Sequence, residues 1–221
     1  MWKGLKISLL FSTLHTVVTG IFALIDLYAV EYIPQLKEMK IEKVSNEEMR
    51  ELYGKITKPV MKNVWLYSIL FIPIFEYVWQ PVEFVSYYQF TKDYVYLLFL
   101  SELPFYFCHR LMHTKLLKKY HQIHHEHTKL LVGMVGLYTH PVDFVISNIL
   151  PTIIIPVLLN VDEFTMKVWL SVAILNNIIV HIGFKPPRTH DIHHLRLNKN
   201  YGYSLYMDNL LGTEKIVLKD E

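Results

Sequence analysis

The sequence predicts an all-α, multi-spanning membrane protein with a cytosolic, histidine-rich end. Apolar residues make up 52% of the 221 residues and are bunched into long runs. Tyrosine, phenylalanine and tryptophan make up 14%, as expected where side chains sit at bilayer interfaces. Most of the 12 histidines fall in clusters that follow apolar runs. The balance of 22 basic against 20 acidic residues gives no field that would favour nucleic acid as a partner.

Residues 1–108 are predicted to contain the N-terminal membrane spans. Residues 5–33 are mainly apolar, and His15, Asp26 and Glu31 are among the exceptions. At 1.5 Å per residue they can cross a bilayer core of roughly 30 Å. Shorter apolar runs follow at 64–79 and 94–108, and the latter carries Glu102. A carboxylate is costly in lipid, so we expect Glu102 at an interfacial span end.

An amphipathic helix is predicted between the first two runs, at residues 35–63. Lysine and glutamate alternate there, and Ser45 is followed three residues later by Glu48. This serine–glutamate spacing is typical of a capping box at a helix start. We therefore expect a cytosolic linker whose helix has one solvated face.

Residues 109–221 are predicted to form the histidine-rich catalytic region, which includes a membrane hairpin at 142–180. Its two apolar runs are separated only by residues 160–163, so they must be antiparallel neighbours. The hairpin starts just after His140 and ends at His181, so both ends return to one face. Lysines and arginines gather on that face, and the positive-inside rule makes it cytosolic.

The histidines have the spacing of metal ligands. A lone histidine is usually a hydrogen-bonded core residue, and we assign His15 and His127 to that class. Three clusters, in contrast, place imidazoles on adjacent helical turns, where they can share an ion. These clusters are His109 and His113; His121, His124 and His125; and His190, His193 and His194. Eight ligands, with His140 and His181 as candidate ninth and tenth, suit two metals.

The ligand type leaves the metal open at this point. An imidazole-dominated site suits zinc, iron, copper or nickel. The single cysteine, Cys108, excludes a thiolate cluster, and carboxylates are few near the histidines. A small, closed zinc site would not need eight histidines, whereas two redox-active irons would need a dry pocket beside a substrate. Asp191 either orients an imidazole or caps a helix.

These clusters resemble the three histidine boxes of the membrane-bound fatty acid hydroxylase superfamily, which includes sterol desaturases and C-4 methyl sterol oxidases. The boxes read His-x-x-x-His from His109, His-x-x-His-His from His121 and His-x-x-His-His from His190. Residues 124–128, 139–143, 181–183 and 200–213 are also similar to that family's intervening signatures. The surroundings of Glu126 and of His140 lean towards sterol C-4 methyl oxidation.

The resemblance implies a helical membrane fold whose cytosolic cap holds two iron ions, with zinc as a substitute. It implies hydroxylation or desaturation of a sterol or fatty acyl lipid with O₂. Electrons would come from a cytochrome b5-type or other donor, and the site would face the cytosol from the endoplasmic reticulum. The implied ligands are His109, His113, His121, His124, His125, His190, His193 and His194, with His181 and His140 added.

A rival interpretation is a non-catalytic membrane protein that binds or transports zinc or another divalent ion. Transport needs polar residues inside the spans. Apart from His15, Asp26 and the two glutamates near possible span ends, Glu76 and Glu102, the runs offer no such residue for transport. A zinc protease is disfavoured because the sequence holds no His-Glu-x-x-His.

Overall fold

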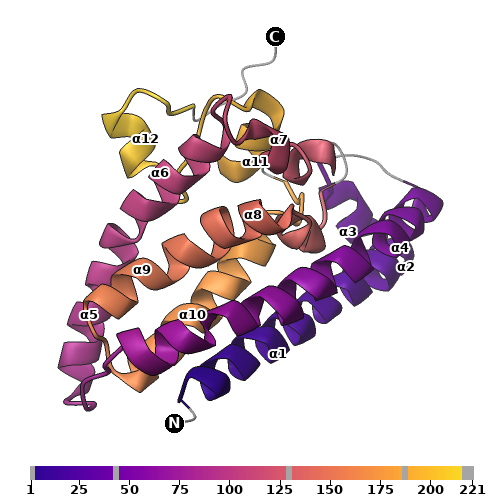
Figure 1. Cartoon of the computed structure of the whole chain (residues 1–221). Helices are drawn as coiled ribbons and strands as arrows, with labels where there is room; N and C mark the ends of the chain where they lie inside the picture. The colour runs from indigo at the N-terminus through magenta and orange to yellow at the C-terminus, as the bar shows by residue number, and fades with distance from the viewer. Residues whose placement is uncertain (1–2, 42–44, 128–130, 186–188, 216–221) are drawn as a thin grey trace.

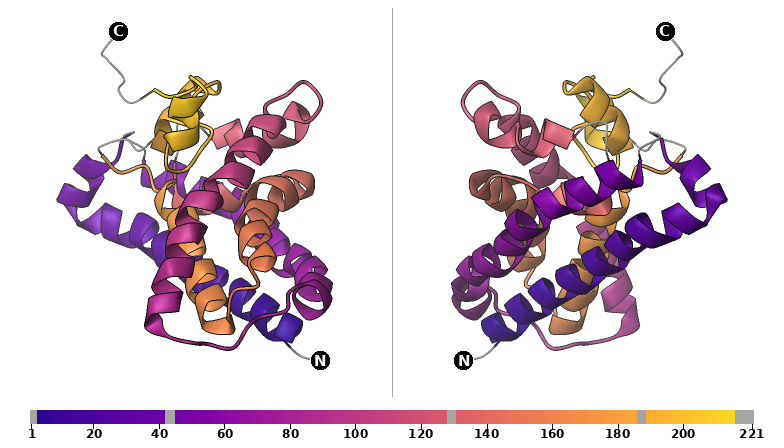
Figure 2. Two further views of the ribbon diagram at one scale, coloured as in Figure 1. Left: turned by 90° about the vertical axis from the view of Figure 1, so that its left-hand side faces the viewer. Right: turned by 90° about the vertical axis from the view of Figure 1, so that its right-hand side faces the viewer.

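The computed structural model describes residues 3–41, 45–127, 131–185 and 189–215, and it is a bundle of helices (Figure 1). Within these ranges no strand occurs, and the isolated bridge between Lys40 and Phe184 is the nearest approach to one. The all-α prediction is confirmed. Long helices form the body of the bundle, and short helices close one end of it (Figures 1 and 2).

The N-terminal helix is one long rod, as the apolar run predicts. It consists of α1 (Lys3–Leu24), a π-turn segment η1 (Ile25–Ala29) and α2 (Val30–Tyr32). Helix α3 (Pro34–Met39) follows at an angle after extended Ile33, and its proline occupies the first turn, where a missing N–H costs nothing.

A second rod lies along the first (Figure 2). It joins α4 (Asn46–Lys62) to η2 (Asn63–Tyr67), η3 (Ile69–Phe71) and η4 (Ile74–Val78). The capping box is confirmed: Ser45 Oγ accepts the Glu48 N–H at 3.2 Å, and the Glu48 carboxylate accepts the Ser45 N–H at 2.9 Å. One face of α4 is buried, so the amphipathic segment packs into the bundle and continues into the second apolar run.

The third rod is α5 (Tyr87–Leu100) followed by α6 (Glu102–Met112), which leads to the histidine-rich end. Glu102 is fully buried inside the protein, a contact that its place in an apolar run did not predict. Its Oε2 accepts the N–H groups of Tyr203 at 3.1 Å and Ser204 at 2.9 Å. The carboxylate therefore anchors the C-terminal segment, with its helix α12 (Tyr206–Leu210), against α6.

The predicted hairpin is formed by α8 (Pro141–Asp143), η7 (Phe144–Ile149) and α9 (Leu150–Leu158) on one side and by α10 (Glu163–Ile179) on the other. Asp162 caps α10 by accepting the Thr165 N–H at 3.0 Å. Both outer ends lie at the histidine-rich end, beside α7 (Lys118–His121), η5 (His124–His127), η6 (Gly133–Leu137) and α11 (Thr189–Arg196) (Figure 1).

Two helical stretches in the described part of the chain are long and apolar enough to cross a membrane. They are Lys3–Tyr32 and Pro141–Leu158. The first N-terminal residues that the structure describes lie at the opposite end of the bundle from α7 and α11 (Figure 1). Length and composition thus favour membrane association, with the histidines at one end of the spanning helices.

A buried ion pair joins the N-terminal rod to the histidine-rich end. Lys40 Nζ lies 2.7 Å from Asp26 Oδ1, and both side chains are buried. The Tyr53 hydroxyl donates to Asp26 Oδ2 at 2.7 Å. The same ammonium donates to the Ile182 carbonyl at 2.6 Å, directly after His181. This network connects Asp26, Lys40 and Tyr53 near the N-terminus to Ile182, which is far away in the sequence.

Candidate metal centre

Nine of the ten predicted ligands converge into two groups at the capped end of the bundle. Helices α6, α7 and α11, the short η5 and the end of α10 supply them. In each group the ligand nitrogens lie within 4.8 Å of one another. The first group is His109, His113, His121, His125 and His193, and the second is His124, His181, His190 and His194.

His140 lies outside both groups. Its Nδ1 accepts the Val142 N–H at 3.1 Å, which makes His140 the N-cap of α8. Its ring lies 4.6 Å from the ring of Tyr120. His15 and His127, which were assigned structural roles from the sequence, also lie outside the groups.

Four histidines are held in one tautomer by partners that can only accept. A carbonyl or carboxylate requires the facing ring nitrogen to donate, which leaves the other nitrogen with a bare lone pair. The four Nδ1 contacts are His109 to the Tyr201 carbonyl at 2.7 Å, His121 to Asp143 Oδ2 at 2.9 Å, His181 to the Asn177 carbonyl at 2.6 Å and His193 to the Lys199 carbonyl at 2.6 Å.

The free Nε2 of His193 faces two other ring nitrogens of its group. His193 Nε2 lies 3.1 Å from His113 Nε2 and 3.3 Å from His125 Nε2. The buried Nε2 atoms of His109 and His181 have no hydrogen-bond partner among the described residues. Converging lone pairs in a buried site repel one another unless a cation lies between them. The donor set therefore fits two metal ions with imidazole ligands.

Burial keeps these imidazoles neutral, which is the form that binds metal. Loss of hydration lowers the pKa of His181 to about 4, partly offset by its backbone hydrogen bond. Burial also lowers the pKa of His193 to about 3. For His109 and His194, burial and then the charges of neighbouring histidines hold the pKa well below its usual value.

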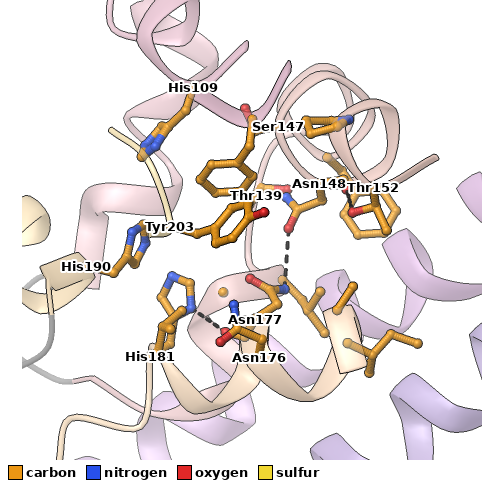
Figure 3. Close-up of a pocket in the computed structure, with 18 of the residues that line it drawn as sticks. His109, Thr139, Ser147, Asn148, Thr152, Asn176, Asn177, His181, His190 and Tyr203 are labelled. Atoms are coloured by element: carbon orange, nitrogen blue, oxygen red, sulfur yellow. Dashed lines mark hydrogen bonds between the residues drawn. The ribbon is translucent and has the colours of Figure 1, made fainter. Parts of the chain in front are cut away.

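A cavity of about 260 Å³ opens directly beneath the two groups (Figure 3). His109, His190 and His181 line one side of it, at the left of Figure 3. The remaining wall comes from α1, α5, η7, α9 and α10 and is mainly apolar. An apolar chamber with a few polar groups is typical of a small-molecule binding site. Nitrogen ligands of both groups thus face a space suited to a lipid.

A sequence model of the fatty acid hydroxylase family matches residues 94–213, which include both histidine groups. The chain belongs to the fatty acid hydroxylase family. The resemblance found in the histidine boxes is thereby confirmed.

Several curated proteins are similar to this family member. Fatty acid hydroxylase domain-containing protein 2 of Macaca fascicularis is 34% identical over 138 residues, which cover 60% of this chain and 41% of that protein. A Dictyostelium discoideum protein named as a methylsterol monooxygenase is 26% identical over 211 residues, 86% of this chain and 77% of that protein. A very-long-chain aldehyde decarbonylase of Oryza sativa subsp. indica is 32% identical over 134 residues, 52% of this chain and 50% of that protein.

The chain thus spans about two fifths of the first of these relatives. The names describe lipid-modifying enzymes, which agrees with the apolar cavity below the histidines. No solved structure matches the chain.

The C-terminal lobe of this fatty acid hydroxylase family member supports the centre from outside. Asp208 accepts the N–H groups of Tyr201 at 2.8 Å and Gly202 at 2.7 Å. This fixes the Tyr201 carbonyl that orients His109. Asp208 lies in the 200–213 segment, whose similarity to the family was visible in the sequence. Glu102, which holds the same lobe through Tyr203 and Ser204, was not predicted to do so. The sequence signal for Glu102 was its charge inside an apolar run.

Asp143 is expected to tune the first group through His121. Replacing it by leucine removes the acceptor that fixes the His121 tautomer, so metal affinity should fall by about 10–100-fold. Asparagine keeps an acceptor oxygen and should cause a smaller loss. Competition with a chelator measures both variants. Equal metal retention in the wild type and both variants would contradict a positioning role for Asp143.

Gly136 leaves room for the ring of His181. A Cβ at this position would lie 2.6 Å from His181 Nδ1 and 2.9 Å from its Cε1. Gly136→Ala should therefore displace the ring and weaken metal binding in the second group by about tenfold or more. Gly54→Ala is the matched control, since nothing lies within 4 Å of its Cβ. Metal content per chain compares the two, and equal occupancy would count against the steric argument.

Proposed function

We propose that this chain is a membrane-bound, non-haem diiron oxygenase that hydroxylates or desaturates a lipid with O₂ and an external electron donor. One observation carries the proposal. Two groups of converging imidazole nitrogens open onto one apolar cavity inside a helical bundle. Such a site can hold two metals and a C–H bond of a lipid side by side, away from bulk water.

The nine grouped histidines would hold two iron ions. When bound, iron would supply the redox chemistry that activates O₂ and breaks a C–H bond. The chain's residues do the rest. Asp143 and the carbonyls of Tyr201, Asn177 and Lys199 keep a proton on Nδ1, so that Nε2 stays free to bind metal.

The cavity wall excludes water and positions the substrate. Phe144 and Ile174 are almost fully buried in it, whereas Leu98 on α5 and Val172 on α10 are exposed. The exposed pair marks a lateral route through which a lipid can reach the cavity from a surrounding bilayer. A sterol or a fatty acyl chain is the proposed substrate class, in keeping with the names of the relatives.

Electrons would come from a cytochrome b5-type carrier or another donor, as the resemblance of the histidine boxes implies. We place the protein in the endoplasmic reticulum as a multi-pass protein whose metal centre faces the cytosol. The basic residues at the histidine-rich end support this orientation.

Metal content and lipid oxidation should be measured together. The protein would be expressed with an electron donor, iron per chain counted, and cellular sterols and fatty acids compared by mass spectrometry. Two irons per chain and a new oxygenated or unsaturated lipid are expected. Zinc instead of iron, with an unchanged lipid profile, would favour a non-catalytic membrane protein that binds zinc or another divalent ion.

A further inference from the structure

The cavity wall contains an amide pair that the metal centre does not use. Asn148 comes from η7 and Asn177 from α10, and both line the cavity. Asn177 Nδ2 donates to Asn148 Oδ1 at 3.4 Å, across the space between the two helices (Figure 3). Two carboxamides thus face each other in a mainly apolar chamber.

The pair keeps hydrogen-bonding capacity to spare. A carboxamide has two N–H donors and a carbonyl acceptor, so one mutual bond leaves donors and an acceptor over. Within the described residues, neither the side-chain amino group of Asn148 nor the side-chain oxygen Oδ1 of Asn177 has a hydrogen-bond partner in the protein. Neighbouring Ser147 also lines the cavity; it is 9% exposed, and its Oγ has no partner within the same residues. Both carboxamides are half-buried, whereas Ser147 Oγ is a buried polar atom without a partner, which is costly and points to a ligand that satisfies it.

The local backbone turns these residues towards the cavity. The segment Phe144–Ile149 is a π-turn, in which hydrogen bonds join residues five apart. Asn148 follows Asp143 by five residues, and both line the cavity. Asp143 is the residue that orients His121. Single π-turns within helices are frequent at functional sites.

The amide pair lies close to the second histidine group. Asn177 precedes His181 by one turn of α10, and its carbonyl accepts the Nδ1–H of His181 at 2.6 Å. Four residues of helix rise about 6 Å. A group held by the amides is thus separated from the second group by about one helical turn.

We propose that Asn148, Asn177 and Ser147 bind a hydroxyl or carbonyl oxygen of the lipid substrate. They select lipids that carry this oxygen a few bonds from the carbon to be oxidised. A hydroxyl both donates and accepts a hydrogen bond, and the amide pair offers a side-chain oxygen to accept and N–H groups to donate. A carbonyl would accept from the spare N–H groups. A plain hydrocarbon leaves the three groups desolvated and without partners, so it binds less well. The inference rests on the proposed function for the identity of the ligand as a substrate.

Equilibrium binding tests the inference without any oxidation. Two matched pairs of tritiated probes are used with the protein in nanodiscs and without an electron donor: cholestanol with cholestane, and hexadecanol with hexadecane. In one pair the oxygenated lipid should bind about tenfold tighter, as one or two hydrogen bonds would give. The arm that shows the preference separates sterol from acyl substrates.

The double variant N148L/N177L should reduce this preference to within about threefold, by weakening only the oxygenated probe. The control is N176L, which makes one asparagine-to-leucine change of the same kind at an exposed position on the cavity edge. It should keep the full preference. If the double variant fails to fold, as judged by its metal content, S147A and N148A give the same readout by removing single polar groups.

An undiminished preference in N148L/N177L would overturn the inference, and so would a wild type that discriminates in neither pair. Lipid oxidation is scored separately. A preference that depends on the amides in a protein that oxidises no lipid supports the polar subsite and removes the proposed function. Oxidation with no such preference does the reverse.

Discussion

Alanine in place of His193 should abolish lipid oxidation and remove one metal per chain. The Nε2 of His193 lies within 3.3 Å of two other ligand nitrogens in the first group. Its own Nδ1 is held by the Lys199 carbonyl, so Nε2 is the nitrogen that His193 offers to a metal. Loss of an outer partner alone typically costs 10–100-fold, and loss of a ligand should cost more than about 100-fold in turnover.

The adjacent residue, His194, provides a second and independent test of the ligand assignment. His194 belongs to the other group, so His194→Ala should remove the other metal. His140→Ala is the control, since His140 caps α8 outside both groups. Elemental analysis of the purified variants counts metals per chain. Full metal content in both His193→Ala and His194→Ala, or the same loss in His140→Ala, would contradict the assignment of ligands.

This division of adjacent histidines shows what a sequence pattern can and cannot predict. Helical spacing predicts which imidazoles gather, because residues three or four apart share a face. It does not predict how they divide. His124 and His125 are neighbours in the chain but join different groups, as do His193 and His194. Consecutive residues point about 100° apart on a helix, so the second and third boxes each contribute to both groups, whereas the first box contributes only to the first group.

The same distinction applies to the polar residues. The capping box at Ser45 was predictable because both partners lie three residues apart. The partners of Glu102 lie about a hundred residues away, at Tyr203 and Ser204. Periodicity indicates the face that a side chain occupies, but not the segment that packs there. The amide of Asn177 was hidden for the same reason, because its partner Asn148 is on another helix.

Lys40→Met should lower the free energy of unfolding by about 3–5 kcal/mol, as removal of one partner from a buried ion pair does. The substitution leaves the Asp26 carboxylate buried, with the Tyr53 hydroxyl as its one remaining partner among the residues that the structure describes. It also removes the donor to the Ile182 carbonyl, next to His181. The second group should therefore lose metal more readily than the first. Thermal unfolding and metal counts measure the two effects.

Two further variants separate the buried charge from ordinary loss of a contact. Arg50 forms an exposed ion pair with Glu31, so Arg50→Met should change stability by no more than about 1 kcal/mol. In the double variant D26N/K40M no charge is left without a partner, so it should be more stable than Lys40→Met alone. If the double variant is only as stable as Lys40→Met, the cost lies in contacts that both variants have lost, such as the bond from the lysine to the Ile182 carbonyl. The ion pair would then serve to position the loop that carries His181, and not to neutralise Asp26.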